Sequence, residues 1–391
     1  MKEYSWPLMK NAIGLEEKFA LIKHILFSNN FTQGEKVEEF ERAWSEWLGA
    51  KHSLFVTSGS TANFLLIDAI KEKYNLKKGD KVIVPACTWV TNINPIIQLG
   101  LTPVFCDINL EDFSFDINSL KDIAQKYPDI KLIFVTHLLG IPAKNHLYQE
   151  IFPNAIIIDD VCESHGCRFE DKNFERVGAN SIGATFSFYF GHHMSTIEGG
   201  MISTNDSELY DLMKMKRSHG MARHSKNFEQ YAKENKEIQS SFLFVTSGYN
   251  FRNTELGAVL GLVQLKKIDE FIRIRVENYN QYFDIMKKHR DKFYPIEYSD
   301  GNSSFCFPLI AKNKEIKNYL IELLKKSNIE FRPIVAGNLL KQPYLKSYTK
   351  NKFPNADILH EYGIYIGNNQ FVNSKDLDIL ENILSEVQYE H

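Results

Sequence analysis

Three short segments of the sequence place polar or ionisable residues where an apolar run gives way to a turn. The first, Thr57–Asn63, follows such a run and precedes a helical pattern of apolar residues. Free N–H groups at a helix start favour a phosphate, and glycine lets the backbone approach it closely. Gly59 and Ser60 are therefore candidate phosphate contacts, although small polar residues at such turns also act as ordinary helix caps.

The second segment, Ile156–Gly166, brings Asp159 and Asp160 to the end of a strongly apolar run. Ligands of open α/β sheets bind at the carboxyl ends of strands. A carboxylate there could keep a protonated ring nitrogen cationic, which a pyridine cofactor needs in order to withdraw electrons. The alternative, a cap for the following helix, is equally compatible with these residues.

The third segment, Ser187–Gly200, contains His192 and His193 between a predicted strand and a Glu-Gly-Gly turn. A single histidine is usually a structural residue. Because imidazole has an ordinary pKa of ~6.5, it can take or give a proton at cellular pH. The adjacent pair beside such a turn therefore indicates a candidate acid–base site.

Alternating helix and strand patterns would position these segments. Val37, Phe40, Trp44 and Leu48 recur at spacings of three and four, which predicts an amphipathic helix over Glu35–Leu48. Short β-branched runs then alternate with helical stretches, and their nearly uniform apolarity is typical of parallel strands buried on both faces. The predicted strands are Leu54–Thr57, Lys81–Val84, Pro103–Cys106, Leu132–Val135, Ile156–Ile158 and Thr185–Phe190.

Beyond these strands the pattern becomes a long charged helix around Leu265–Tyr282 and then restarts as a smaller unit from Tyr294 to His391. We therefore predict an α/β protein with a large domain over residues 1–265 and a smaller C-terminal α+β domain over residues 266–391. The polar, Lys/Glu-rich segment Ser225–Ser241 predicts a surface excursion.

Composition narrows the functional class. The 391 residues are 43% hydrophobic and 24% charged, with a formal net charge of −3 and no long basic run, so we expect a globular protein that does not bind nucleic acid. The absence of a signal-like leader and of roughly 18 consecutive apolar residues predicts a cytoplasmic protein without a membrane span. Five irregularly spaced cysteines predict free thiols, without a disulfide framework or a metal site.

In this order and at these separations, the three segments resemble the DegT-type nucleotide-sugar aminotransferases, a branch of the fold-type-I pyridoxal phosphate enzymes. The resemblance covers nearly the whole chain and includes Phe31–Gly34, Pro85–Trp89, His137–Gly140 and Gly248–Arg252. It implies an aminotransferase-like large domain with a mostly parallel sheet. It also implies pyridoxal 5′-phosphate (PLP) and pyridoxamine 5′-phosphate (PMP) as cofactors, and a homodimer with composite active sites.

The resemblance also implies how individual residues contact the cofactor. Gly59, Ser60 and Ser187 would bind its phosphate. Trp89 would stack on its pyridine ring, and Asp160 would pair with the ring nitrogen.

The sequence departs from the family pattern at one position. The family has Ser-Phe, three residues, and then the lysine that links covalently to the cofactor, whereas here Ser187 and Phe188 lead to His192. The histidine variant resembles the GDP-4-keto-6-deoxy-D-mannose 3-dehydratases of this family. This implies that His192 is the catalytic base and that L-glutamate supplies an amino group. The C3 hydroxyl of a GDP-linked 4-keto-6-deoxy sugar would then be removed with release of ammonia, a step of 3,6-dideoxysugar biosynthesis for polysaccharides.

Five further residues enter through the same resemblance. Asn250 would reach the phosphate of the neighbouring subunit's cofactor. Glu163 stands where relatives usually have His or Gln near the ring. His219, Arg332 and Asn338 are candidate substrate contacts, although Arg332 and Asn338 could instead shape a Pro/Gly-containing loop.

Alternatives remain open at this point. A nucleotide-sugar 4-aminotransferase could use another lysine, but none lies between Arg176 and Glu208. A degenerate relative could bind cofactor or nucleotide sugar without catalysis, which would leave the ionisable residue at the lysine position unexplained. A dehydratase that works with an iron–sulfur reductase would need clustered cysteines. The residues do not decide between GDP and CDP, or between a hexose and a heptose.

Overall fold

The computed structural model describes residues 4–387, and a mostly parallel sheet forms its centre. Within those residues the sheet has seven strands, and only β9 runs antiparallel to its neighbours β1 and β8. The strand order is β1 (His52–Val56), β9 (Gly200–Thr204), β8 (Ala184–Ser187), β5 (Ile156–Asp160), β4 (Leu132–Thr136), β2 (Lys81–Pro85) and β3 (Thr102–Cys106). The mostly parallel sheet of the predicted large domain is therefore confirmed.

Two details of the sheet differ from the sequence prediction. The run Thr185–Phe190 is a strand only as far as Ser187, because the chain then leaves the sheet to form the loop that carries His192. Strand β9, which the sequence patterns do not predict, follows Gly199 directly. All five of its residues are buried, so it lacks the alternation of polar and apolar residues that marks a half-exposed strand.

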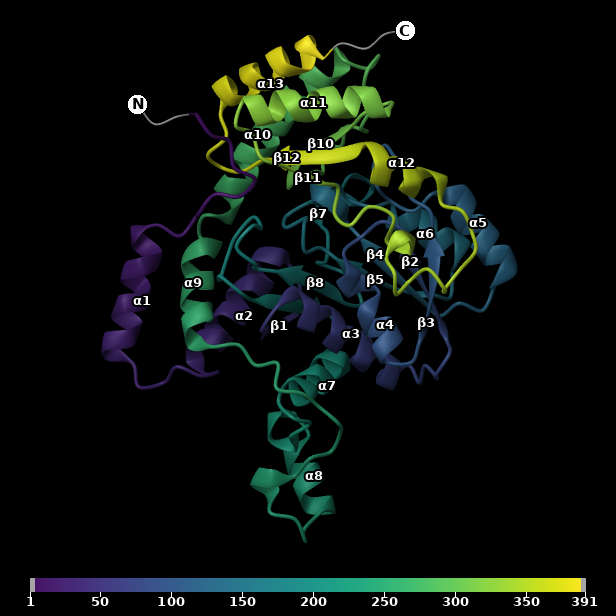
Figure 1. Cartoon of the computed structure of the whole chain (residues 1–391). Helices are drawn as coiled ribbons and strands as arrows, with labels where there is room; N and C mark the ends of the chain where they lie inside the picture. Colours follow the sequence, from purple (N-terminus) through teal and green to yellow (C-terminus); the bar gives the residue numbers. More distant parts are fainter. Residues whose placement is uncertain (1–3, 388–391) are drawn as a thin grey trace.

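Helices cover both faces of the sheet (Figure 1), because successive strand residues point to opposite sides. In β2, for example, Val82 and Val84 pack in one core cluster and Ile83 packs in another. The first face is covered by α3 (Gly59–Lys73), α4 (Asn94–Gln98) and α7 (Ser207–Arg217), and the second by α2 (Glu35–Leu48), α5 (Ile117–Lys126), α6 (Asn145–Ile151) and α9 (Glu255–Leu265). The helix predicted over Glu35–Leu48 is confirmed, and its four predicted apolar residues are buried.

Helix α1 (Leu15–Phe27) lies against α9 with its polar side inward. Glu17 is fully buried and accepts hydrogen bonds from Gln264 at 2.8 Å and from Lys267 at 2.7 Å. The opposite face is apolar and between 51% and 70% exposed; it consists of Leu15, Phe19, Ile22 and Leu26. The apolar face of this helix therefore points away from the rest of the described chain.

The C-terminal part forms the predicted smaller α+β unit, a three-stranded antiparallel sheet with helices packed on it. Its elements are α10 (Ile268–Lys287), β10 (Cys306–Ile310), α11 (Lys314–Lys326), β11 (Phe331–Pro333), α12 (Pro354–Tyr362), β12 (Gly363–Gly367) and α13 (Ser374–Glu386). Trp6 also packs in this core, and its Nε1 donates to the carbonyl of Gly367 at 2.9 Å. Leu339 and Phe353, in contrast, pack in the core of the large sheet. The domain boundary between residues 265 and 266 therefore stays a prediction.

A surface excursion connects α7 to α9. Figure 1 shows its helix α8 (Phe228–Glu234) farthest from the sheet, beyond α7. This agrees with the excursion predicted over Ser225–Ser241. The strands β6 (Arg168–Phe169) and β7 (Glu175–Arg176) form a separate two-stranded sheet. None of the helices in residues 4–387 is long and apolar enough to cross a membrane.

Candidate active site

A cavity of about 340 Å³ lies between the carboxyl ends of β5 and β8 and the C-terminal unit. It contains eight of the residues that the sequence predicts: Gly59, Ser60, Trp89, Asp160, Glu163, Ser187, His192 and Arg332. A larger hollow of about 590 Å³ between α5 and residues 348–353 contains none of them. The smaller cavity is therefore the candidate active site.

The start of α3 provides an anion site. Ser58 caps the helix by accepting a hydrogen bond from the N–H of Thr61 at 3.1 Å, which leaves the N–H groups of Gly59 and Ser60 free of helical partners. A Cβ at Gly59 would lie 2.8 Å from the Cβ of Ser187, so only glycine permits this close approach of α3 to β8. The hydroxyl of Ser187 and the two free N–H groups therefore line one corner of the cavity, and this corner fits a phosphate.

Asp160 is held in place by hydrogen bonds on both of its carboxylate oxygens. Its Oδ2 accepts from the amides of Asn63 at 2.8 Å and Asn92 at 2.9 Å, and its Oδ1 accepts from the N–H of Cys162 at 2.9 Å. Thr185 donates to the carbonyl oxygen of Asn63 at 2.6 Å, which fixes the orientation of that amide. The carboxylate is thus fixed in position before any ligand arrives.

No cation within residues 4–387 forms an ion pair with Asp160, although the residue is only 4% exposed. A buried carboxylate without a cationic partner, at the wall of a cavity, fits a protonated pyridine nitrogen. Trp89 lines the same cavity and is 54% exposed, which leaves aromatic surface free to cover a flat ring. The residues present therefore fit the cofactor that the sequence resemblance implies.

His192 has no hydrogen-bond partner for its buried Nδ1. Its ring packs against Phe305, with the ring centroids 5.4 Å apart, and against Tyr189 at 6.2 Å. Burial, together with the positive charge of Arg275, lowers the pKa of His192 to about 3 in the ligand-free protein. The pKa of His192 thus differs from the ordinary value near 6.5 assumed from the sequence, and the imidazole at the cavity wall is neutral.

A layer of buried basic residues lies behind His192, and the sequence analysis does not predict it. His193 is fully buried; its Nε2 lies 3.0 Å from the carbonyl of Ser303, and its Nδ1 lies 3.4 Å from Nδ1 of His165. Only the first histidine of the adjacent pair therefore faces the cavity. Arg275 donates to the carbonyl of Phe305 at 3.0 Å, and burial lowers its pKa to about 10.

Glu163 is the second carboxyl group of the site. Its Oε2 accepts a hydrogen bond from the N–H of Leu139 at 3.1 Å. Burial raises the pKa of Glu163 to about 7, and the negative charge of Asp160 adds to this rise. The side chain therefore carries a proton over part of the physiological pH range.

Three predicted residues do not line the cavity of the described chain. Asn250 is exposed; its backbone pairs with Ser218, and its Oδ1 accepts from Nε of Arg252 at 3.0 Å. His219 has a left-handed backbone, with φ of 67°, in the turn after α7. Asn338 is buried; its Oδ1 accepts from the N–H of Leu340 and its Nδ2 donates to Asp357, both at 2.9 Å.

The cavity also contains residues that no sequence pattern indicates. Met9 fills the space beside Gly191, where a Cβ would lie 2.1 Å from its sulfur. Phe305 and Tyr365 complete the wall from the C-terminal unit. These residues come from distant parts of the chain, so only the fold brings them together.

Comparison with known proteins places this geometry in a family. The sequence matches the DegT/DnrJ/EryC1/StrS aminotransferase family over residues 13–384. The GDP-4-keto-6-deoxy-D-mannose 3-dehydratase of Escherichia coli O55:H7 is 36% identical over 380 residues, which cover 94% of this chain and 96% of the relative.

Solved structures give the same result. The E. coli GDP-4-keto-6-deoxy-D-mannose-3-dehydratase with bound hydrated PLP has a TM-score of 0.90 and 33% identity, and covers 98% of this chain and 100% of its own. A structure of GDP-4-keto-6-deoxymannose-3-dehydratase with a trapped PLP-glutamate geminal diamine has a TM-score of 0.88 at 33% identity, covering 97% and 100%. The chain therefore belongs to the DegT/DnrJ/EryC1/StrS aminotransferase family.

Proposed function

We propose that this protein is a PLP/PMP-dependent 3-dehydratase that removes the C3 hydroxyl of a GDP-linked 4-keto-6-deoxy sugar. L-Glutamate supplies the amino group, and ammonia is released. The observation that carries the proposal is His192, a neutral imidazole in the cavity at the position where the family pattern has its cofactor-binding lysine. The names of the similar proteins found by both comparisons, of sequences and of structures, support it.

The cavity residues divide the work of holding the cofactor. The free N–H groups of Gly59 and Ser60 and the hydroxyl of Ser187 would bind its phosphate, and Trp89 would pack against its ring. Asp160 keeps the ring nitrogen protonated, because its carboxylate is fixed in place and lacks another cation. When bound, the cofactor supplies a protonated pyridine that withdraws electrons from the reacting atoms.

His192 moves the protons of the reaction. Its neutral imidazole would accept the proton lost from the C4′ carbon of the cofactor and return it to the departing C3 hydroxyl oxygen, so that water leaves in place of hydroxide. A lysine at this position would also capture the cofactor covalently, whereas imidazole does not. Within the described cavity wall no lysine takes over that role.

Arg332 would receive the anionic substrates. It is the only arginine or lysine among the described residues that line the cavity, and it lies on β11 of the C-terminal unit. Both L-glutamate and a nucleotide diphosphate carry negative charge that a guanidinium binds well. His219 and Asn338, which do not line the cavity of the described chain, belong to the substrate proposal only through the sequence resemblance.

The proposal includes a cytoplasmic homodimer with composite active sites. The exposed apolar face of α1 supports contact with a second copy of the chain. Single apolar residues on a surface are common, but four large ones on one helix face form a patch that a partner can cover. The exposed Asn250 supports a contact in the partner subunit. All five cysteines are free thiols, which supports a reducing compartment.

The deciding experiment incubates the purified protein with PMP, glutamate and GDP-4-keto-6-deoxy-mannose, with no reductase added. The expected products are a 3-deoxy keto sugar and ammonia in equal amounts, measured by mass spectrometry and by a coupled ammonia assay. An amino sugar without ammonia would show a 4-aminotransferase instead. A parallel panel with CDP-linked and 4-keto-6-deoxyheptose substrates identifies the nucleotide and the sugar.

A further inference from the structure

A buried lysine outside the cavity holds the turn that carries Asn250. Lys216, in the last turn of α7, is only 1% exposed. Its Nζ lies 2.9 Å from Oδ2 of Asp68 and 2.7 Å from Oε2 of Glu72, both on α3, and 3.3 Å from the carbonyl of Ser247. A buried ammonium needs such partners, and here two carboxylates and one carbonyl supply them.

The turn itself, residues 246–252, is joined to this cluster at several points. The hydroxyl of Tyr249 donates to Asp68 at 3.1 Å, and the hydroxyl of Thr246 donates to Glu72 at 3.1 Å. The N–H of Tyr249 donates to the carbonyl of Lys216 at 2.7 Å. A Cβ at Gly248 would lie 2.8 Å from that same carbonyl, so the turn and the end of α7 are in close contact.

Asn250 is oriented by this arrangement. Its backbone pairs with Ser218 directly after α7, and its Oδ1 accepts from Nε of Arg252. The amide NH₂ therefore faces away from Arg252 as a free donor on an exposed residue, which is the group that a phosphate oxygen requires.

Helix α3 links the two features. Its first residues, Gly59 and Ser60, form the phosphate corner of the cavity, and its later residues Asp68 and Glu72 hold Lys216. We propose that Lys216 is a positioning residue: held by Asp68 and Glu72, it fixes the 246–252 turn so that Asn250 contacts the cofactor phosphate bound in a second copy of this chain. This rests on the proposed homodimeric PLP enzyme.

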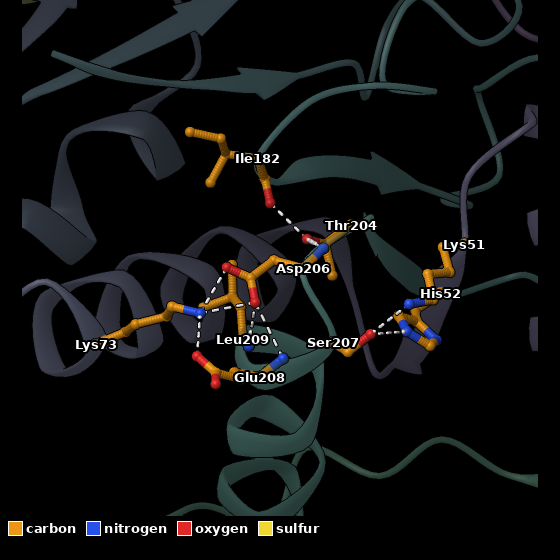
Figure 2. A network of polar contacts seen from close by, with 9 residues as sticks. All are labelled: Lys51, His52, Lys73, Ile182, Thr204, Asp206, Ser207, Glu208 and Leu209. Carbon is orange, nitrogen blue, oxygen red and sulfur yellow. Dashed lines mark hydrogen bonds and ion pairs between the residues drawn. The ribbon is translucent and has the colours of Figure 1, made fainter. Parts of the chain in front are cut away.

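A second ion cluster between the same two helices provides a matched control. Lys73 at the end of α3 contacts Asp206 at 2.6 Å and Glu208 at 3.1 Å, at the start of α7. Figure 2 shows this ammonium between the two carboxylates. Its side chain is 20% exposed, and its hydrogen-bond and ion-pair partners among residues 4–387, Asp206 and Glu208, lie outside the 246–252 turn.

The experiment measures the affinity of the full chain for PMP and for pyridoxamine, which lacks the phosphate. The variants are K216M, N250A, the double variant K216M/N250A, and the control K73M. Y249F is a milder variant that removes one hydroxyl from the cluster and keeps the lysine paired. Sedimentation and thermal unfolding establish that each variant is folded and dimeric.

We expect K216M and N250A each to weaken PMP binding roughly tenfold, the loss of about one hydrogen bond to a charged group, and to leave pyridoxamine binding unchanged. Y249F should show a smaller loss of the same kind, the double variant should bind PMP no more weakly than N250A alone, and K73M should match the wild type.

Three results would overturn the inference: K216M and Y249F with wild-type PMP affinity, an equal loss for PMP and pyridoxamine, or an N250A variant that binds PMP normally. The test measures binding and not turnover. A wild-type protein that binds PMP but releases no ammonia would therefore refute the proposed function, while the affinities of the variants could still be compared.

Discussion

Asp160 and His192 face the same cavity, yet their surroundings are opposite. Every oxygen of the Asp160 carboxylate has at least one donor, supplied by two asparagine amides and a backbone N–H. The Nδ1 of His192 has no partner, and the groups behind its ring are aromatic or basic. Under the proposed function, the group that stays charged and fixed is surrounded by hydrogen bonds, whereas the group that gains and loses a proton is left unpaired and neutral.

The largest effect is expected when His192, the unpaired group, is replaced. His192→Asn keeps a polar side chain but removes the basic ring nitrogen that the proposed proton transfer needs, so the dehydration rate should fall by about 10²–10⁴-fold. Stopped assays of ammonia and keto sugar measure this at saturating PMP. Because the side chain belongs to a cavity wall, the variant should unfold at nearly the wild-type temperature. Dehydration at the wild-type rate would remove His192 from the proposed mechanism.

His192→Lys replaces the imidazole with an amine and should retain somewhat more activity than His192→Asn. The new amine should capture PLP covalently, so borohydride should fix a pyridoxyl group on residue 192 and most dehydration should be lost. The wild type is the control, and borohydride should fix nothing on it. A pyridoxyl adduct on any lysine of the active wild-type protein, found by peptide mass spectrometry, would overturn the assignment of the replaced lysine.

The fully hydrogen-bonded group, Asp160, is tested by Asp160→Asn. The new amide cannot hold a proton on the ring nitrogen, and its NH₂ group would face the donors of Asn63 and Asn92, so activity should fall by about 10²-fold. An unmatched buried donor should also lower the free energy of unfolding by about 1–3 kcal/mol.

The matched control for Asp160→Asn is the neighbouring Asp159→Asn. The Asp159 carboxylate lies 3.0 Å from His137 Nε2 and does not line the cavity. That change should reduce stability in urea titrations and leave the rate of the folded enzyme within a few fold of the wild type. Equal losses of rate in both variants would mean that Asp160 acts only through stability.

The smallest effect concerns Glu163, the second carboxyl group of the cavity. Unlike Asp160, it accepts only one hydrogen bond within the described chain, from the N–H of Leu139. Its folded pKa of about 7 lies above the ordinary 4.5, so the protonated form is favoured in the folded protein. The stability this contributes is complete below pH 4.5 and is lost as the pH rises through 7. The free energy of unfolding without cofactor should therefore decline across this range, and Glu163→Gln should flatten the decline. A slope unchanged by the substitution would assign it to another group.

The same contrast explains which parts of the site could be predicted from sequence. Gly59, Asp160 and His192 sit at strand ends or turns whose local patterns are readable, and the cavity brings them together. Asn63 and Asn92, which hold Asp160, give no such signal, because an asparagine inside a helix pattern does not reveal its partner. Support of this kind comes from side chains far apart in sequence.

The fold shows a similar limit. The helix over Glu35–Leu48 and most strands follow from periodicity, whereas β9 is buried on both faces and carries no alternation. Helix α1 is amphipathic like its neighbour, but its apolar face points outward. Periodicity predicts that a helix has an apolar face. It does not predict whether that face points into the protein or toward solvent, which depends on what the helix packs against.

The place of Trp6 sets an order of events during synthesis. Its backbone pairs beside Ile329 and its indole binds the carbonyl of Gly367, so both partners leave the ribosome more than 300 residues after it. The segment around Trp6, which also brings Met9 to the cavity, therefore has no docking site until residues 329–367 have emerged. This segment is made before the strands that it packs against, so Met9 can take its place in the cavity wall only after β12 has been made.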